Sequence, residues 1–221
     1  MKRYLIEFFG TFIVVLAVSL TENPFAMGPM YLAMLYLGAR ISGAHYNPAI
    51  SLASWLRGTL STERLPWYVL AQVLGALAAI GFEYKLSNSL YVPDVSPEDN
   101  VVFICLLEVL FTFVLAYVFL VVRTVPRVRD TQLYGIILGM TFAGLSFMGG
   151  LFNPAIGAGA FLLHFFSQAG EAATDTATVG MLHNILVYIV CPLVGGALGG
   201  FAFDYLEAPA SGQFASVDSA E

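Results

Sequence analysis

Charged residues are scarce in this sequence. Only 11% of its 221 residues are Asp, Glu, Lys or Arg, whereas 58% are hydrophobic and the mean hydropathy is +0.80. Because soluble domains carry about 25% charged residues, this composition excludes an ordinary soluble protein and favours a chain that is surrounded by lipid. Basic stretches with interleaved aromatic residues are absent too, which argues against a nucleic-acid partner.

Cysteine and histidine are also few. The two cysteines, Cys105 and Cys191, stand inside apolar stretches with neither a disulfide-like nor a metal-like spacing, so we interpret them as packing residues. The three histidines form no pattern of the kinds that catalytic triads and zinc proteases use. The sequence therefore predicts a protein without enzymatic activity, cofactor or metal ion.

Long apolar stretches are what the sequence has instead. A helix needs about 20 apolar residues to cross a bilayer. Six stretches approach this length: Tyr4–Leu20, Pro24–Ala39, Leu65–Tyr84, Val101–Val122, Gln132–Met148 and Met181–Leu206. Two more, Asn47–Leu56 and Asn153–Phe165, are about half as long, which is typical of re-entrant segments. The sequence predicts an all-α membrane protein with six transmembrane helices and two re-entrant half-helices.

Basic residues indicate how the chain is oriented. Lys2 and Arg3 precede the first span, and three arginines follow the fourth, whereas the loop after the third span has one lysine and three acids. Basic loops face the cytoplasm in most membrane proteins. We therefore expect a multi-pass protein of the cell membrane with both termini in the cytoplasm.

The sequence also repeats itself. Glu7-Phe-Phe-Gly-Thr-Phe in the first span matches Glu108-Val-Leu-Phe-Thr-Phe in the fourth, and an Asn-Pro-Ala motif follows each of them, at Asn47 and at Asn153. Each half contains three spans, an odd number, so the second half must enter the membrane from the opposite side. The pattern predicts an inverted repeat whose two half-helices meet near the membrane midplane.

The repeat suggests the domain organisation. We expect one domain over residues 1–206, with halves of about 1–90 and 101–206. Residues 207–221 are small and polar, and are predicted to form a disordered cytoplasmic tail.

Each Asn-Pro-Ala motif carries the signals of a helix start. Asn is a preferred N-cap, and Pro is favoured at the first helical position. The motif residues are Asn47, Pro48, Ala49, Asn153, Pro154 and Ala155. Because a helix N-terminus carries about half a positive charge, two that face each other repel cations, hydronium included. The asparagine NH₂ groups can donate to a passing oxygen, and the alanines are small enough to let the half-helices touch.

Three further polar residues stand in the apolar stretches or beside the first motif. Glu7 and Glu108 are costly in lipid, and their matched places in the repeat favour a bracing role in which each carboxylate holds backbone N–H groups before a half-helix. A proton relay is the alternative. His45 is expected to line the cytoplasmic mouth of the pore, and it has no histidine partner for a metal site.

Three segments resemble the signature stretches of aquaporins and glycerol facilitators, the major intrinsic proteins. They are Ile41-Ser-Gly-Ala-His-Tyr-Asn-Pro-Ala, Ala71-Gln-Val-Leu-Gly-Ala and Gly150-Leu-Phe-Asn-Pro-Ala, and the resemblance extends from about Tyr4 to Leu206. It implies a right-handed six-helix bundle, a homotetramer with one pore per subunit, and passage of water or small uncharged solutes through a lipid-embedded channel.

The sequence departs from this family at the outer constriction. Channels of the family commonly have an arginine directly after the second motif, where this chain has Ile156. The resemblance puts the other constriction positions at Met27, at Gly150 and at one of Thr141, Phe142 or Ser146. Such a wall has no fixed cation and few donors. We therefore expect the outer mouth to admit neutral solutes somewhat larger than water.

Two alternatives remain open at this stage. One is a facilitator of glycerol-like solutes, ammonia or gas with low selectivity for water. The other is a non-conducting structural membrane protein that retains the fold, because a fold does not by itself determine a function. The sequence leaves the identity of the solute open.

Overall fold

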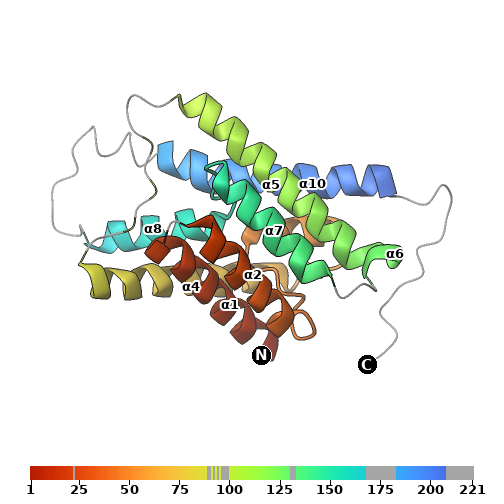
Figure 1. Ribbon diagram of the computed structural model, residues 1–221, viewed down its shortest axis with the longest axis horizontal. Coiled ribbons are helices and arrows are strands. Elements are labelled where there is room, and N and C mark those ends of the chain that lie inside the picture. The colour runs from red at the N-terminus through yellow and green to blue at the C-terminus, as the bar shows by residue number, and fades with distance from the viewer. Residues whose placement is uncertain are drawn as a thin grey trace.

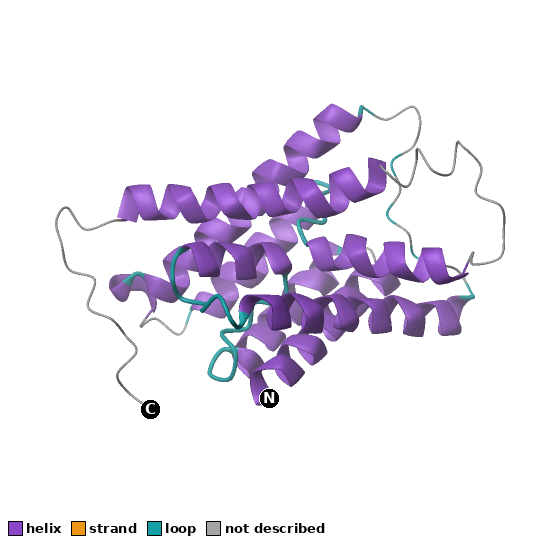
Figure 2. Ribbon diagram, turned by 180° about the vertical axis from the view of Figure 1, so that it is seen from behind, coloured by secondary structure: helices purple, strands orange, loops and turns teal. Residues whose placement is uncertain are grey.

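The computed structural model describes residues 1–21, 23–88, 91, 93, 95, 100–129, 133–167 and 183–207. All regular elements in these ranges are helices (Figures 1 and 2). They are α1 (Lys2–Thr21), α2 (Pro24–Gly38), α3 (Pro48–Leu56), α4 (Leu65–Ser87), α5 (Val101–Thr124), α6 (Pro126–Arg129), α7 (Tyr134–Phe147), α8 (Pro154–Ser167), the π-helical η1 (Leu186–Val190) and α10 (Cys191–Glu207). The prediction of an all-α protein is confirmed.

Within the described residues, four helices are long and apolar enough to cross a membrane. These are α1, α4, α5 and the continuous helix His183–Glu207, with 20 to 25 residues each and mean hydropathies of 1.7 to 2.7. α2 and α7 are shorter, at 15 and 14 residues. Gln132 and Met181, where two of the predicted spans begin, lie outside the described residues. So does the predicted tail, except Glu207, which ends α10 as an ordered helical residue.

Glycines allow two pairs of long helices to approach closely. On α4, a Cβ atom at Gly75 would overlap with the carbonyl oxygen of Phe8 on α1, and on α10 one at Gly195 would overlap with that of Val109 on α5. Phe8 follows Glu7 and Val109 follows Glu108, so the contacts are equivalent in the two halves. The α1–α4 and α5–α10 pairs are therefore repeats of one packing unit.

The half-helices α3 and α8 join the two units. α8 packs against α4, and α3 packs against α10, so each half-helix lies on the long helix of the other half. Gly196 on α10 lies against Ala49 of α3, and Gly159 on α8 lies against Ala76 of α4. In Figure 1, α8 extends toward the side opposite α6. Because each half-helix packs on a long helix of the other half, the two halves form one bundle.

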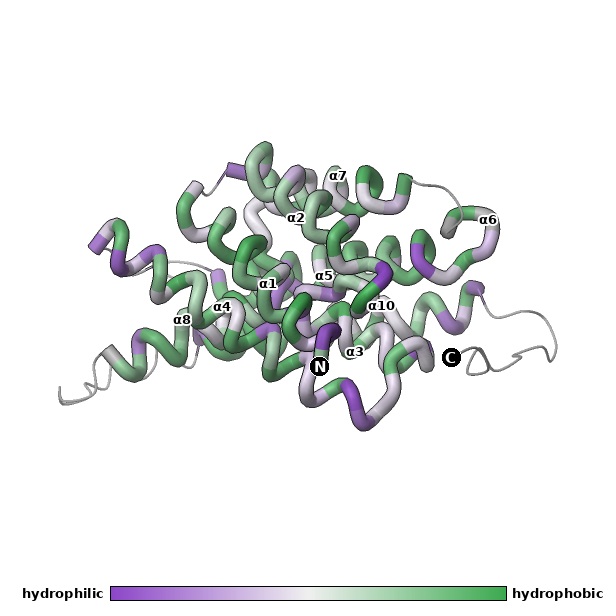
Figure 3. Tube along the Cα trace, turned by 90° about the horizontal axis from the view of Figure 1, so that it is seen from below, coloured by the Kyte–Doolittle hydropathy of each residue, from purple (hydrophilic) through white to green (hydrophobic). Residues whose placement is uncertain are grey.

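The outer faces of the long helices are apolar. Leu70 and Leu74 on α4 and Leu106 and Leu110 on α5 are large, exposed hydrophobic side chains, and hydrophobic residues predominate along the helices in Figure 3. Several polar side chains, by contrast, are buried in the interior. An apolar exterior around a partly polar interior is the pattern of a protein that is surrounded by lipid.

Gly75→Ala is expected to lower the midpoint of thermal unfolding of the detergent-solubilised protein. The added methyl group overlaps with the Phe8 carbonyl group and costs about 1–3 kcal/mol. Gly81→Ala on the same helix is the matched control, because a Cβ there meets nothing within 4 Å and alanine favours a helix over glycine by about 1 kcal/mol. Equal midpoints for the two variants would contradict the close packing of α1 and α4.

Candidate functional site: the junction of the half-helices

Both half-helices begin with the same cap. The Oδ1 atom of Asn47 accepts a hydrogen bond from the backbone N–H of Ala49 at 2.8 Å, and that of Asn153 accepts one from Ala155 at 3.1 Å. Pro48 and Pro154 take the first helical positions, where their lack of an N–H group costs nothing. The short polar caps thus use local sequence signals to start two helices deep inside the bundle.

The same two asparagines bond across the junction. Nδ2 of Asn47 donates to the carbonyl oxygen of Phe152 at 2.8 Å, and Nδ2 of Asn153 donates to that of Tyr46 at 3.1 Å. Each acceptor is the residue directly before the opposite asparagine, and both acceptors have left-handed backbone, with φ of 52° at Tyr46 and 40° at Phe152. The N-termini of α3 and α8 are therefore tied to one another by two symmetric hydrogen bonds.

Each cross-bond uses one of the two N–H groups of an asparagine side chain. From the sequence, these NH₂ groups were expected to donate to a passing solute, but one hydrogen of each bonds to the opposite backbone. The second hydrogen of each amide takes no part in the cross-bonds. Both asparagines are buried, so the donors lie in an environment where hydrogen bonds are electrostatically strong.

Glu7 holds the segment that leads into α3. Its carboxylate accepts hydrogen bonds from the backbone N–H groups of His45 at 3.0 Å and Tyr46 at 2.7 Å. It also accepts from the Ser42 hydroxyl group at 2.5 Å and from the Gln72 side-chain amide at 2.8 Å. The side chain is completely buried. Glu7 thereby satisfies N–H groups that an irregular backbone would leave unpaired at membrane depth.

Glu108 holds the equivalent segment before α8. Its two carboxylate oxygens accept hydrogen bonds from the backbone N–H groups of Leu151 and Phe152, each at 2.7 Å. In both halves the carboxylate therefore fixes the residue whose carbonyl group accepts from the opposite asparagine. The same arrangement of two carboxylate oxygens and two backbone N–H groups thus occurs in each half.

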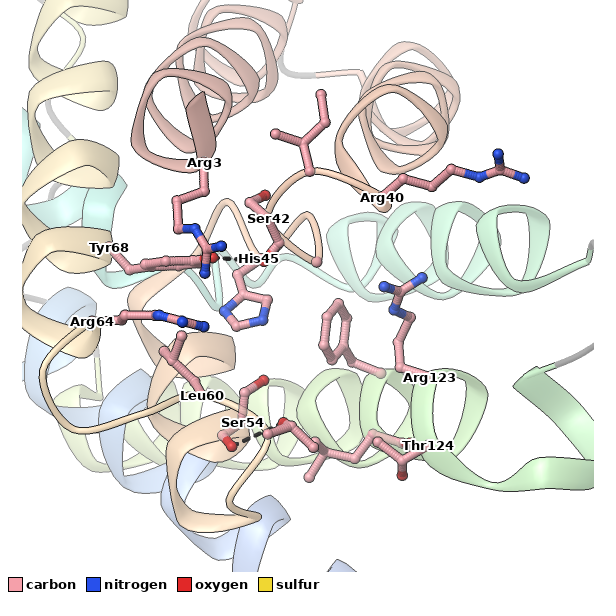
Figure 4. A pocket seen from close by; sticks show the side chains of 15 residues that line it. Arg3, Arg40, Ser42, His45, Ser54, Leu60, Arg64, Tyr68, Arg123 and Thr124 are labelled. Atoms are coloured by element: carbon pink, nitrogen blue, oxygen red, sulfur yellow. Dashed lines mark hydrogen bonds between the residues drawn. The ribbon is translucent and has the colours of Figure 1, made fainter. Parts of the chain in front are cut away.

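His45 lies at one end of this junction. Its Nδ1 atom is 3.1 Å from the Ser51 hydroxyl oxygen, and its ring contacts those of Tyr68 and Phe119, with centroids 5.2 and 5.4 Å away. The side chain also lines a pocket of about 230 Å³ (Figure 4). The structure thus places His45 between the first Asn-Pro-Ala motif and a cavity.

The four predicted constriction residues are all buried. Ile156 has no exposed surface, Phe142 is 1% exposed and Met27 is 6% exposed. A Cβ on Gly150 would meet the rings of Phe111 and Phe152. A solute can therefore touch Ile156 only when neighbouring side chains move. Among the three fifth-span candidates Phe142 is the fully buried one, since Thr141 and Ser146 are partly exposed.

Tyr31 is a buried interior residue that was not predicted from the sequence. Its ring packs on Phe142, with centroids 4.7 Å apart, and Phe142 in turn packs on Phe152 at 4.9 Å. Its hydroxyl group is buried and has no hydrogen-bond partner among the described residues. The available signal was its position four residues after Met27, which places both on one face of α2.

The chain matches a known protein family over most of its length. The profile of the Major intrinsic protein family matches residues 1–203. The chain belongs to the major intrinsic protein family. Aquaporin NIP1-1 of Zea mays is 29% identical over 93% of this chain and 74% of that protein. Aquaporin TIP4-1 of Zea mays is 33% identical over 76% of this chain and 63% of that protein.

A solved structure shows the same fold. The X-ray structure of the aquaglyceroporin from Plasmodium falciparum matches with a TM-score of 0.78 and 21% sequence identity, over 94% of this chain and 97% of that one. This major intrinsic protein is therefore a multi-pass integral membrane protein with the aquaporin fold.

Glu108→Gln is expected to loosen the segment before α8. Glutamine supplies one acceptor oxygen for two N–H groups, so one of the N–H groups of Leu151 and Phe152 loses its partner, at a cost of about 1–3 kcal/mol. Hydrogen–deuterium exchange of these two amides should become faster. Glu83→Gln is the control, because Glu83 accepts a hydrogen bond from the Ser87 hydroxyl group near the end of α4, away from the segment before α8. Wild-type exchange in Glu108→Gln would contradict the bracing role.

Proposed function

We propose that this protein is a channel for the passive permeation of water and small uncharged solutes, with ions and protons excluded at the Asn47–Asn153 junction. The observation that carries the proposal is the pair of symmetric bonds that holds two helix N-termini face to face. Membership of the major intrinsic protein family supports it. Transport of this kind needs no catalytic step.

Cation exclusion follows from the two helix N-termini. Each contributes a partial charge of about +0.5, and both lie where the asparagines and alanines of the motifs are buried. Because there is little water to screen these charges, a cation that approaches the junction loses hydration and meets a positive potential. A neutral solute does not meet this barrier.

Proton exclusion follows from the remaining asparagine N–H groups. A water oxygen that accepts from Asn47 and Asn153 has both lone pairs engaged. It then has no free lone pair with which to accept a proton from the next water in the file. The junction therefore interrupts the chain of hydrogen bonds along which a proton would be relayed.

The proposed constriction favours neutral solutes with a small polar group. Met27, Phe142, Gly150 and Ile156 provide an apolar wall. The ring of Tyr31 packs on Phe142, and its buried hydroxyl group supplies one donor and one acceptor in the interior. An apolar wall with one polar group binds ions poorly. This combination favours water and glycerol-like solutes over charged ones.

We propose further that the protein is a homotetramer in the cell membrane, with both termini in the cytoplasm. Support for the orientation comes from Arg3, Arg40, Arg64 and Arg123, which line one pocket near the N-terminus and thus concentrate positive charge at one end of the bundle. The exposed apolar faces of α4 and α5 provide surfaces for lipid or for neighbouring subunits. Residues 1–206 form one domain in this proposal.

Asn47→Asp and Asn153→Asp are expected to reduce water permeability by about tenfold. Each removes the side-chain N–H donor to the solute, and such a hydrogen bond contributes about 1–2 kcal/mol. Each also puts a negative charge where the helix dipoles are positive, so cation leakage should rise. Stopped-flow light scattering and ion-flux measurements on proteoliposomes test both effects. Wild-type water flux and ion leakage in both variants would remove the asparagines from the pathway.

Tyr31→Phe is expected to lower the permeability of water and glycerol several-fold without lowering the unfolding midpoint. The variant removes a polar group that solutes use, but that forms no hydrogen bond with the described protein residues. Tyr46→Phe is the control, because the Tyr46 hydroxyl group donates to the carbonyl oxygen of Met34 at 2.8 Å. That variant should lose stability. Unchanged permeability in a folded Tyr31→Phe protein would exclude Tyr31 from the pathway.

A further inference from the structure

The pocket beside His45 is lined by positive charge. Its volume is about 230 Å³, and Arg3, Arg40, Arg64 and Arg123 are among its lining residues. They come from the start of α1, the turn after α2, the residue before α4 and the last turn of α5. No acidic side chain among the described residues lines it. Four segments distant in sequence thus bring arginines to one cavity.

Two of these arginines are directed at the cavity. In Figure 4, Arg3 and Arg64 extend toward His45, Arg123 lies across the pocket from them, and Arg40 points away. Arg123 is held in place because it donates to the Ala39 carbonyl oxygen at 3.2 Å and lies over the Tyr134 ring. Within the described part of the chain, neither Arg3 nor Arg64 forms an ion pair.

A buried hydroxyl group of the same pocket also lacks a partner. Ser54, in the last turn of α3, is 1% exposed and lines the pocket. Its Oγ atom forms no hydrogen bond with any described residue. The neighbouring hydroxyl groups of Thr59 and Tyr68 are already used, since they donate to the carbonyl oxygens of Ser54 and Ser42. Ser54 is therefore a donor at the wall of the pocket that no described residue uses.

Two described acids, Glu63 and Glu7, form their hydrogen bonds with groups other than these arginines. Glu63 is fully exposed, and hydrogen bonds from its own backbone N–H and the Ser61 hydroxyl group lower the pKa of its carboxyl group, with Arg64 a smaller cause. Glu7 already accepts hydrogen bonds from the lead segment and from Gln72. Neither acid lines the pocket, whose described lining residues include four arginines.

We propose that this pocket binds a small oxyanion of the phosphate class and that the bound anion obstructs the adjacent mouth of the channel. Guanidinium groups match phosphate oxygens in a bidentate geometry, and the Ser54 hydroxyl group supplies one more donor. The preference for basic residues on the cytoplasmic side explains arginines at this end. It does not explain their convergence with a buried hydroxyl group that has no partner in the described part of the chain. The phosphate group belongs to a free anion or to a lipid headgroup.

Binding is tested separately from transport, because only the obstruction depends on the proposed function. Isothermal titration calorimetry with inorganic phosphate, on the full chain in phosphatidylcholine nanodiscs, should show saturable binding. Arg3→Gln and Arg64→Gln should each weaken it by about tenfold, through lost charge-assisted hydrogen bonds. Lys2→Gln is the matched control, because it removes the same charge from the neighbouring residue, which does not line the pocket.

A second set of nanodiscs, containing phosphatidylinositol 4-phosphate, distinguishes the two sources of the phosphate group. If the headgroup occupies the pocket, inorganic phosphate should no longer bind in these nanodiscs, whereas a pocket for free phosphate should titrate as before. Ser54→Ala should weaken binding in the preferred form and gives a second variant if an arginine substitution impairs folding. The absence of saturable binding in both sets, or equal weakening by Lys2→Gln and Arg3→Gln, would overturn the site.

The obstruction is tested with phosphate trapped inside proteoliposomes. It should reduce water permeability of the wild type and of Lys2→Gln, but not of the Arg3→Gln/Arg64→Gln double variant. Phosphate that binds without reducing flux would overturn the obstruction and leave the binding site. A protein that passes no solute even without phosphate would refute the proposed function, while the calorimetry would still decide the site.

Discussion

Two amide–carbonyl hydrogen bonds join the N-termini of the half-helices α3 and α8 at the centre of this protein. Asn47 donates to the residue before Asn153, and Asn153 donates to the residue before Asn47. Without them, two helix N-termini with like partial charges would repel each other in a medium that screens poorly. The cross-bonds offset this repulsion and use one N–H group of each asparagine. The other N–H group is the one that we propose as a donor to a solute. The structure of the junction and its proposed selectivity therefore depend on the same two side chains.

The rest of the fold keeps this junction in place. Glu7 and Glu108 fix the left-handed residues whose carbonyl groups accept the cross-bonds. Each half-helix, α3 and α8, packs on a long helix of the other half, which keeps the two N-termini close together. Gly75 and Gly195 permit the close helix pairs that support each half. Because the units are equivalent, each constraint acts twice, once from either side of the junction.

Much of this architecture could be predicted from the sequence, since it rests on local signals and on repetition. Asn before Pro predicts a cap, and the matched positions of Glu7 and Glu108 predict equivalent surroundings. The cross-bonds join residues 105 and 107 positions apart, so no local pattern indicates them. Three further features depend on how distant helices pack, which the sequence leaves open. They are the Tyr31 hydroxyl group without a partner among the described residues, the burial of Ile156, and the convergence of Arg3 with Arg64.

A double-mutant cycle on Asn47 and Asn153 tests whether their cross-bonds hold the junction. The free energy of unfolding is measured for the wild type, Asn47→Ala, Asn153→Ala and the double variant in the same detergent. If the two side chains hold one junction, the first substitution loosens it and the second costs less. A coupling energy of at least about 0.5 kcal/mol is then expected between Asn47 and Asn153. Losses that add to within about 0.3 kcal/mol would show that the two asparagines act independently, and would contradict a junction held by their cross-bonds.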